Sequence, residues 1–193
     1  MKKFVAILLI GIFSAFTLTA ATDWYTRKFP TQLIKANGRP VNTATALKGK
    51  MVAVYFSASW CGPCRGFTPQ LVKFYKKAAK KNNIEIVFVS SDKNSDAMKD
   101  YMKEDSMPWL AVPFNSIERK TLQKIKRVGG IPNLTVFDAN GKLISVNARW
   151  DVVLLGEKAI QAWKSPNYKP KTYDDYQKTA SNKKNKKNKK QRK

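Results

Sequence analysis

A hydrophobic stretch that runs into a Cys-x-x-Cys turn constrains this chain more than any other part of its sequence. Residues 52–56 are apolar, β-branched or aromatic, and they are followed closely by Cys61-Gly62-Pro63-Cys64. These are the only two cysteines in the chain. A disulfide across so short a loop removes little entropy from the unfolded chain. Redox chemistry therefore explains the pair better than stabilisation of the fold does.

The residues after Cys64 predict a helix. Apolar side chains recur there at the spacing of one helical face, at Phe67, Leu71, Phe74 and Tyr75. The predicted helix runs from about Cys61 to Lys81, so Cys61 lies at its N-terminus. Unpaired N–H groups and the positive end of the helix dipole favour a thiolate at that place. We expect Cys61 to be the nucleophile and Cys64 to attack the Cys61 sulfur in a mixed disulfide.

The cysteine pair has two other interpretations. A structural zinc site needs about four Cys or His ligands, and the chain has no His and no third Cys. Two buried, unreactive thiols are the remaining alternative, because free cysteine is often buried. No metal and no cofactor are expected.

Two mostly apolar, β-branched runs predict a pair of neighbouring strands. Residues 51–57 and 84–90 flank the predicted helix, and a strand–helix–strand order implies a parallel pair with a right-handed crossover. Both strands then end at the edge of the sheet that carries Cys61. Asp92 follows the second strand directly. It either lies near the dithiol or caps the helix predicted over residues 95–104.

At two places the chain resembles the thioredoxin superfamily, most closely its tryparedoxin and nucleoredoxin branch. The first is the run from Tyr55 to Leu71 and the second is Met107 to Phe114. The resemblance implies an α/β, three-layer sandwich with a central mixed β-sheet and helices on both faces. Gly62 departs from the branch, which typically has Pro there, and Tyr55 replaces the buried Asp of thioredoxin. Trp109, in the second run, either lines a partner groove or fills the core.

The same resemblance assigns a role to the segment Gly129-Gly130-Ile131-Pro132. Thioredoxin-like proteins carry a cis-proline loop beside the Cys-x-x-Cys turn, and it maps here onto Ile131-Pro132. The backbone of Ile131 would then be free to pair with an extended substrate. With Trp60, Gly62 and Pro63 around Cys61, these residues form the predicted substrate-binding surface.

The two ends of the chain differ from its middle. Residues 1–21 combine two lysines, an apolar run and small residues, a pattern typical of a signal peptide. An uncleaved membrane anchor is the alternative. The pattern predicts export, to the periplasm in a bacterium and otherwise to the secretory lumen or the extracellular space. Residues 22–164 form the predicted thioredoxin-like domain, and the Lys-rich tail 165–193 is expected to be disordered.

The net charge of +24 is unusually high. Residues 165–193 alone hold 11 Lys or Arg and two Asp. Such a field attracts polyanions such as an anionic envelope, a nucleic acid or an acidic protein. A solvated surface without a specific partner is the alternative.

These observations predict an enzyme, a thiol–disulfide oxidoreductase that uses Cys61 and Cys64. The Gly-Pro pair between the cysteines resembles reducing members of the superfamily, so a reductase is favoured over an oxidase or isomerase. The predicted partners are disulfide-containing proteins or small molecules, and a thiol protein that donates electrons. The alternative is a polyanion- or envelope-binding module that uses the basic surface and the Lys-rich tail.

Overall fold

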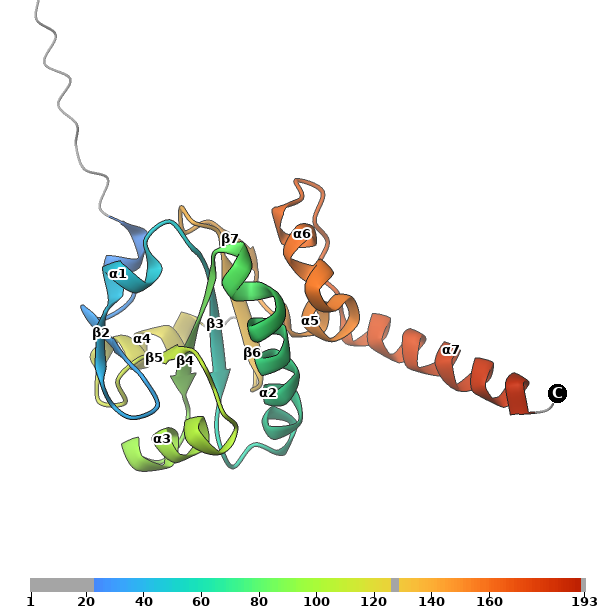
Figure 1. Ribbon diagram of the computed structural model, residues 1–193, viewed down its shortest axis with the longest axis horizontal. Coiled ribbons are helices and arrows are strands. Elements are labelled where there is room, and N and C mark those ends of the chain that lie inside the picture. The colour runs from blue at the N-terminus through green and yellow to red at the C-terminus, as the bar shows by residue number, and fades with distance from the viewer. Residues whose placement is uncertain (1–22, 126–128, 192–193) are drawn as a thin grey trace, which may run out of the picture.

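A seven-stranded mixed β-sheet forms the centre of the computed structural model, which describes residues 23–125 and 129–191 (Figure 1). Its strand order is β2-β1-β5-β4-β3-β6-β7. The central strands β3 (Met51–Ser57) and β4 (Ile84–Ser90) are parallel, and they pair from Met51 with Ile84 to Ser57 with Ser90. Every residue of both strands is buried, as expected for strands covered on both faces.

The outer strands make the sheet mixed. On one side of the central pair, β6 runs antiparallel to β3 and β7 antiparallel to β6. On the other side, β5 is parallel to β4, and β1 and β2 follow as an antiparallel pair. The bounds of these strands are β1 Gln32–Ile34, β2 Pro40–Asn42, β5 Leu110–Ala111, β6 Asn133–Phe137 and β7 Leu143–Ser145.

Helices cover both faces of the sheet, so the predicted three-layer architecture is confirmed. Side chains of α2, α3, α5 and α6 share one hydrophobic cluster with Ala53 and Tyr55 of β3. Side chains of α1 and α4 share the other with Val52 and Val54. The bounds are α1 Thr43–Leu47, α2 Gly62–Phe74, α3 Ser95–Glu104, α4 Ile117–Ile125, α5 Arg149–Leu155, α6 Ala159–Lys164 and α7 Tyr173–Gln191.

Two helical segments are divided in the structure. The helix predicted to Lys81 is α-helical only to Phe74, and a π-helical turn and a 3-10 turn complete it before the left-handed Asn83. The last helix of the domain is split into α5 and α6 by Gly156, whose φ of +54° interrupts the α-helical path.

The C-terminal tail differs from the prediction of disorder. Instead of an irregular chain, the structure has the helix α7, which projects away from the sheet (Figure 1). Its first turns contact α5 through aromatic side chains. Composition predicted disorder because residues 182–190 are all Lys or Asn, and it did not reveal the contacts that start the helix.

Residues 1–21, the predicted signal peptide, lie outside the described part of the chain. Within residues 23–125 and 129–191, no helix combines the length and the hydrophobicity that crossing a bilayer requires.

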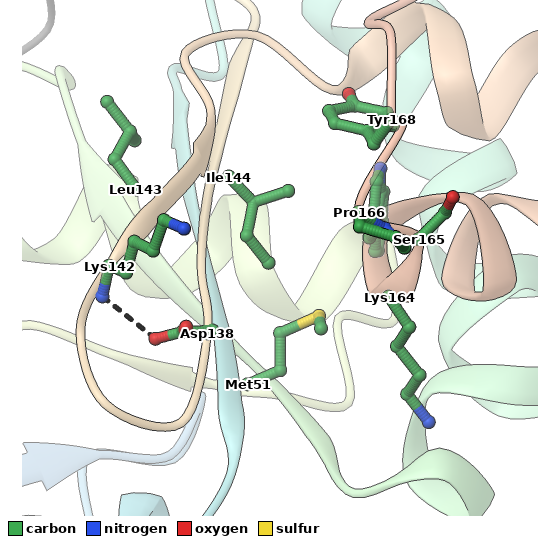
Figure 2. Close-up of a pocket in the computed structure, with 10 residues that line it drawn as sticks. Met51, Asp138, Lys142, Leu143, Ile144, Lys164, Ser165, Pro166 and Tyr168 are labelled. Atoms are coloured by element: carbon green, nitrogen blue, oxygen red, sulfur yellow. Dashed lines mark hydrogen bonds between the residues drawn. The ribbon is translucent and has the colours of Figure 1, made fainter.

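A pocket of about 440 Å³ lies between the hairpin after β6 and the segment that follows α6 (Figure 2). Leu143 and Ile144 line one side, and Pro166 and Tyr168 line the other. Met51, the first residue of β3, also borders it. Since Cys61 follows the other end of β3, this pocket is separate from the dithiol.

Candidate active site

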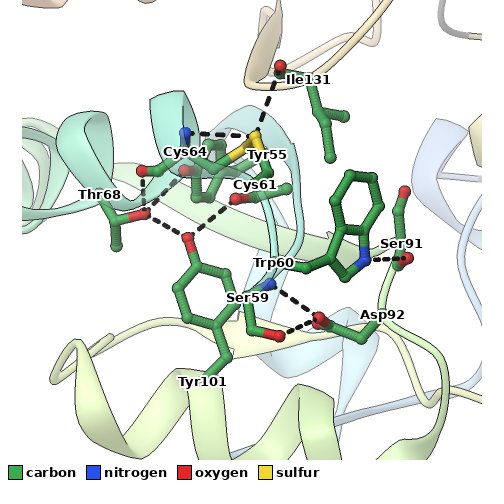
Figure 3. The surroundings of a disulfide bond; sticks show 11 residues. Tyr55, Ser59, Trp60, Cys61, Cys64, Thr68, Ser91, Asp92, Tyr101 and Ile131 are labelled. Atoms are coloured by element: carbon green, nitrogen blue, oxygen red, sulfur yellow. Dashed lines mark hydrogen bonds between the residues drawn. A yellow bond between two sulfur atoms is a disulfide. The ribbon is translucent and has the colours of Figure 1, made fainter.

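The two cysteines form a disulfide at the N-terminus of α2 (Figure 3). Cys61 is the N-cap residue, and its Sγ lies 3.3 Å from the backbone N–H of Cys64, which donates to it. Cys64 is completely buried, whereas 6% of Cys61 is exposed. Cys61 is therefore the more exposed of the two cysteines, and it lies at the helix N-terminus, as the helical periodicity predicted.

The Ile131–Pro132 peptide bond is cis, and its loop lies beside the dithiol. The carbonyl oxygen of Ile131 is 3.6 Å from Cys61 Sγ, and the Ile131 side chain packs against the cluster that contains both cysteines. Pro132 is buried. Gly130 has a φ of +92°, a backbone angle at which a residue with a side chain would be strained. Segments 70 residues apart in sequence thus meet at Cys61.

Exposed residues surround Cys61 on its solvent side. Trp60 is 61% exposed, and its indole N–H donates to the Ser91 carbonyl oxygen at 3.3 Å. Gly62 and Pro63 are exposed as well. The structure therefore brings together Trp60, Gly62, Pro63 and Ile131 around the first cysteine.

Asp92 lies near the dithiol and does not cap α3. Its buried carboxylate accepts hydrogen bonds from the Ser59 N–H at 2.7 Å, the Ser59 hydroxyl at 2.8 Å and the Ser90 hydroxyl at 2.7 Å. Asn94 caps α3 instead, accepting from the Ala97 N–H at 2.8 Å. Asp92 thus ties the turn before Cys61 to the end of β4.

Replacing Asp92 with Ala should destabilise this turn. The Ser59 N–H and two hydroxyls lose their common acceptor, and an unsatisfied buried donor costs about 1–3 kcal/mol. We expect the free energy of unfolding of the oxidised protein to fall by about 2 kcal/mol in denaturant titrations. Asp96→Ala is the matched control, because Asp96 is an exposed carboxylate on α3; an equal loss in both variants would contradict the assigned role of Asp92.

Tyr55, which stands where thioredoxin has a buried Asp, belongs to a cluster of buried hydroxyl groups. The Thr68 hydroxyl lies 2.8 Å from the Tyr55 hydroxyl and 2.7 Å from that of Tyr101, and it donates to the Cys64 carbonyl oxygen at 2.9 Å. The Ser57 hydroxyl is 2.9 Å from Tyr101. Burial raises the pKa of Tyr55 far above its ordinary value. The Tyr55 hydroxyl is therefore held in its neutral form.

Sequence reasoning missed this hydroxyl cluster. Its members come from β3, α2 and α3, and up to 44 residues separate the bonded pairs. The only signals were Tyr55 and Ser57, two hydroxyl-bearing residues in the mostly apolar strand β3.

Trp109 belongs to the core. It is 2% exposed and makes edge-to-face contacts with Tyr55 and Tyr75, with ring centroids 6.1 and 5.8 Å away. Of the two interpretations of this residue, core filling is confirmed, and the partner groove is wrong because the ring is covered.

Comparison with known proteins agrees with this architecture. A family model described as thioredoxin-like matches residues 49–143. A tryparedoxin of Trypanosoma brucei brucei is 44% identical over 112 residues, which cover 56% of this chain and 75% of the relative. A solved tryparedoxin from Trypanosoma brucei has a TM-score of 0.64 at 39% identity, covering 72% of this chain and 96% of that one.

Nucleoredoxins match over a smaller share of their length. The probable nucleoredoxin 1 of Arabidopsis thaliana is 47% identical over 116 residues, which are 60% of this chain and only 20% of that protein. The chain thus corresponds to about a fifth of this larger relative.

These relatives correct one prediction. The chain was expected to be exported, but the nucleoredoxins and tryparedoxin that it matches are intracellular proteins, so the prediction is wrong. It depended on the pattern of residues 1–21 alone, which combine two lysines, an apolar run and small residues, and this pattern is not specific to signal peptides.

Three findings lead to one assignment. They are the strand order of the sheet, the cysteine pair at the start of α2, and a structural match that covers nearly all of a tryparedoxin chain. The chain belongs to the thioredoxin superfamily, in its tryparedoxin and nucleoredoxin branch.

Proposed function

We propose that this protein is a thiol–disulfide oxidoreductase that works as a reductase. The observation that carries the proposal is the position of the Cys61–Cys64 disulfide at the N-terminus of α2, beside the cis-proline loop. A dithiol in that position alternates between a reduced form and the disulfide that the structure shows.

The first step of the proposed reaction uses the Cys61 thiolate. It attacks one sulfur of a substrate disulfide, the substrate S–S bond breaks, and a mixed disulfide between Cys61 and the substrate forms. The departing substrate thiolate takes up a proton. The Cys64 N–H, 3.3 Å from Cys61 Sγ, and the dipole of α2 favour the thiolate that starts this step.

The second step uses Cys64. It loses its proton and attacks Cys61 Sγ, the Cys61–Cys64 bond forms, and the second substrate sulfur leaves as a thiol. Two electrons and two protons pass from the protein to the substrate. A separate dithiol donor, which we expect to be a thiol protein, then reduces the Cys61–Cys64 disulfide. Because Cys64 is buried, external disulfides react with Cys61 first.

The proposed substrates are protein or small-molecule disulfides. An extended substrate chain would pair with the backbone at Ile131 as an added strand, and Trp60, Gly62 and Pro63 would contact its side chains. The alternative of a polyanion-binding module in which the dithiol is incidental receives no support from the comparisons.

The reduction potential of the Cys61–Cys64 pair tests the direction of electron flow. We expect a value near that of thioredoxin, about −270 mV, when the protein is equilibrated with glutathione or dithiothreitol buffers and its thiols are counted. A value near about −120 mV, typical of a strong oxidant, would assign the protein to disulfide formation instead.

A further inference from the structure

We propose that α7 is a cationic arm that recruits acidic protein substrates to the dithiol. This inference rests on the proposed reductase function and names the class of substrate. It depends on three observations, namely how the arm is anchored, where its first turns lie and how its charges are distributed.

A buried carboxylate anchors the segment that leads into the arm. Asp151, on α5, is completely buried. It accepts hydrogen bonds from the Trp163 indole N–H at 3.0 Å, the Tyr168 hydroxyl at 2.5 Å and the Lys171 backbone N–H at 2.8 Å. These bonds hold the chain after α6 against α5, so the start of α7 has a defined position.

Aromatic contacts continue this attachment into α7 itself. The Tyr176 ring stacks on Trp150 with centroids 4.9 Å apart and an interplanar angle of 28°. Tyr173 lies 5.4 Å from the same Trp150 ring. The Arg149 guanidinium lies over Trp150, 4.2 Å from its centroid. The first turn of α7 is therefore docked on α5.

This docking places the arm beside the Cys-x-x-Cys turn. Tyr176 and Trp150 line one side of a cavity of about 320 Å³, and Pro63 and Gly66 of α2 line the other. Pro63 lies between the two cysteines. A protein bound at Cys61 is thus within reach of the root of α7, and the rest of the helix extends outward from there (Figure 1).

Charge along α7 is segregated. Asp174 and Asp175 occupy the first turn, where the positive end of the helix dipole favours them. The remainder has seven Lys and no acidic residue. Its described side chains Lys178, Lys183 and Lys184 are exposed, and none makes an ion pair within the described residues. These three side chains give the described part of α7 beyond its first turn a positive surface that faces solvent.

An acidic protein fits this arrangement better than a nucleic acid does. The positive surface of α7 begins next to the cavity that α2 also lines. A ligand bound to α7 is therefore brought close to Cys61, at the start of α2. A dithiol there acts only on a disulfide, and a protein carries both a disulfide and acidic side chains. Charge complementarity of this kind mainly raises the rate of association.

Two peptides provide the test. Each contains one disulfide within the same core sequence, flanked by Glu residues in one peptide and Gln residues in the other. The reduced full-length protein is mixed with each, and thiol release gives the second-order rate constants. We expect the acidic peptide to react about tenfold faster at low salt. The preference should vanish at about 1 M salt, where the Debye length is about 3 Å.

Matched variants locate the effect. K178Q/K183Q/K184Q should lower the preference at least about threefold, since association depends steeply on local charge. Y173A/Y176A should lower it too, because the arm keeps its charge but loses its attachment. The control K76Q/K80Q/K81Q removes three exposed charges beyond the far end of α2 and should keep the wild-type preference.

Three results would overturn the inference. One is an unchanged preference in the α7 variants, and another is an equal loss in the control. The third is that single-stranded DNA binds the protein at a lower concentration than the acidic peptide does, and that K178Q/K183Q/K184Q abolishes this DNA binding. That result would make α7 a nucleic-acid site. Failure of the wild-type protein to reduce even the Gln peptide would instead refute the proposed reductase function.

Discussion

Cys61→Ser is expected to lower the rate of disulfide reduction by about 10³-fold or more, the scale seen when a nucleophile that acts as part of a unit is removed. Serine has nearly the same size but is not ionised at neutral pH, so no anion forms at the N-terminus of α2. Cys64 does not compensate, because it is completely buried. The measurement is insulin reduction with dithiothreitol as the electron donor, compared with the wild-type protein at equal concentration.

Cys64→Ala separates the two cysteines by role. The Cys61 thiolate remains able to attack, but the mixed disulfide is no longer resolved from within, so a covalent adduct with a disulfide substrate should accumulate. Mass spectrometry under non-reducing conditions detects it. An adduct that forms with Cys61→Ser and not with Cys64→Ala would reverse the assignment of nucleophile and resolving cysteine.

Asp151→Ala is expected to cause the largest loss of stability among the substitutions considered. The side chain is completely buried and accepts three hydrogen bonds. Removing it leaves the donors on Trp163, Tyr168 and Lys171 without their acceptor, at about 1–3 kcal/mol for each that stays buried. Allowing for relaxation, we expect the free energy of unfolding to fall by about 3 kcal/mol in denaturant titrations.

Asp174→Ala is the matched control for this prediction. Asp174 is also a carboxylate, in the first turn of α7, but its side chain is exposed. Substitutions of exposed residues usually change the free energy of unfolding by about 0.5 kcal/mol or less. Similar losses in the two variants would show that general charge, and not the buried hydrogen bonds of Asp151, stabilises the C-terminal segment.

Local sequence patterns predicted the elements that carry the dithiol. The strands over residues 51–57 and 84–90, their parallel pairing and the helix over residues 95–104 were all found as expected. Each has strong periodicity or a continuous apolar run. The cis peptide bond at Ile131–Pro132 was also found, but its prediction came from resemblance to the superfamily, since spacing alone does not identify a cis proline.

Only the tertiary structure decided how Asp92, Tyr55 and Asp151 are used. Asp92 bonds to Ser59, 33 residues earlier, Tyr55 joins a hydroxyl cluster in place of an acid, and Asp151 anchors the chain after α6. The sequence by itself determined where the reactive sulfurs lie, because helix and strand periodicity are local. The partners of buried polar groups are set by folding, which joins distant residues without leaving any repeating pattern in the chain.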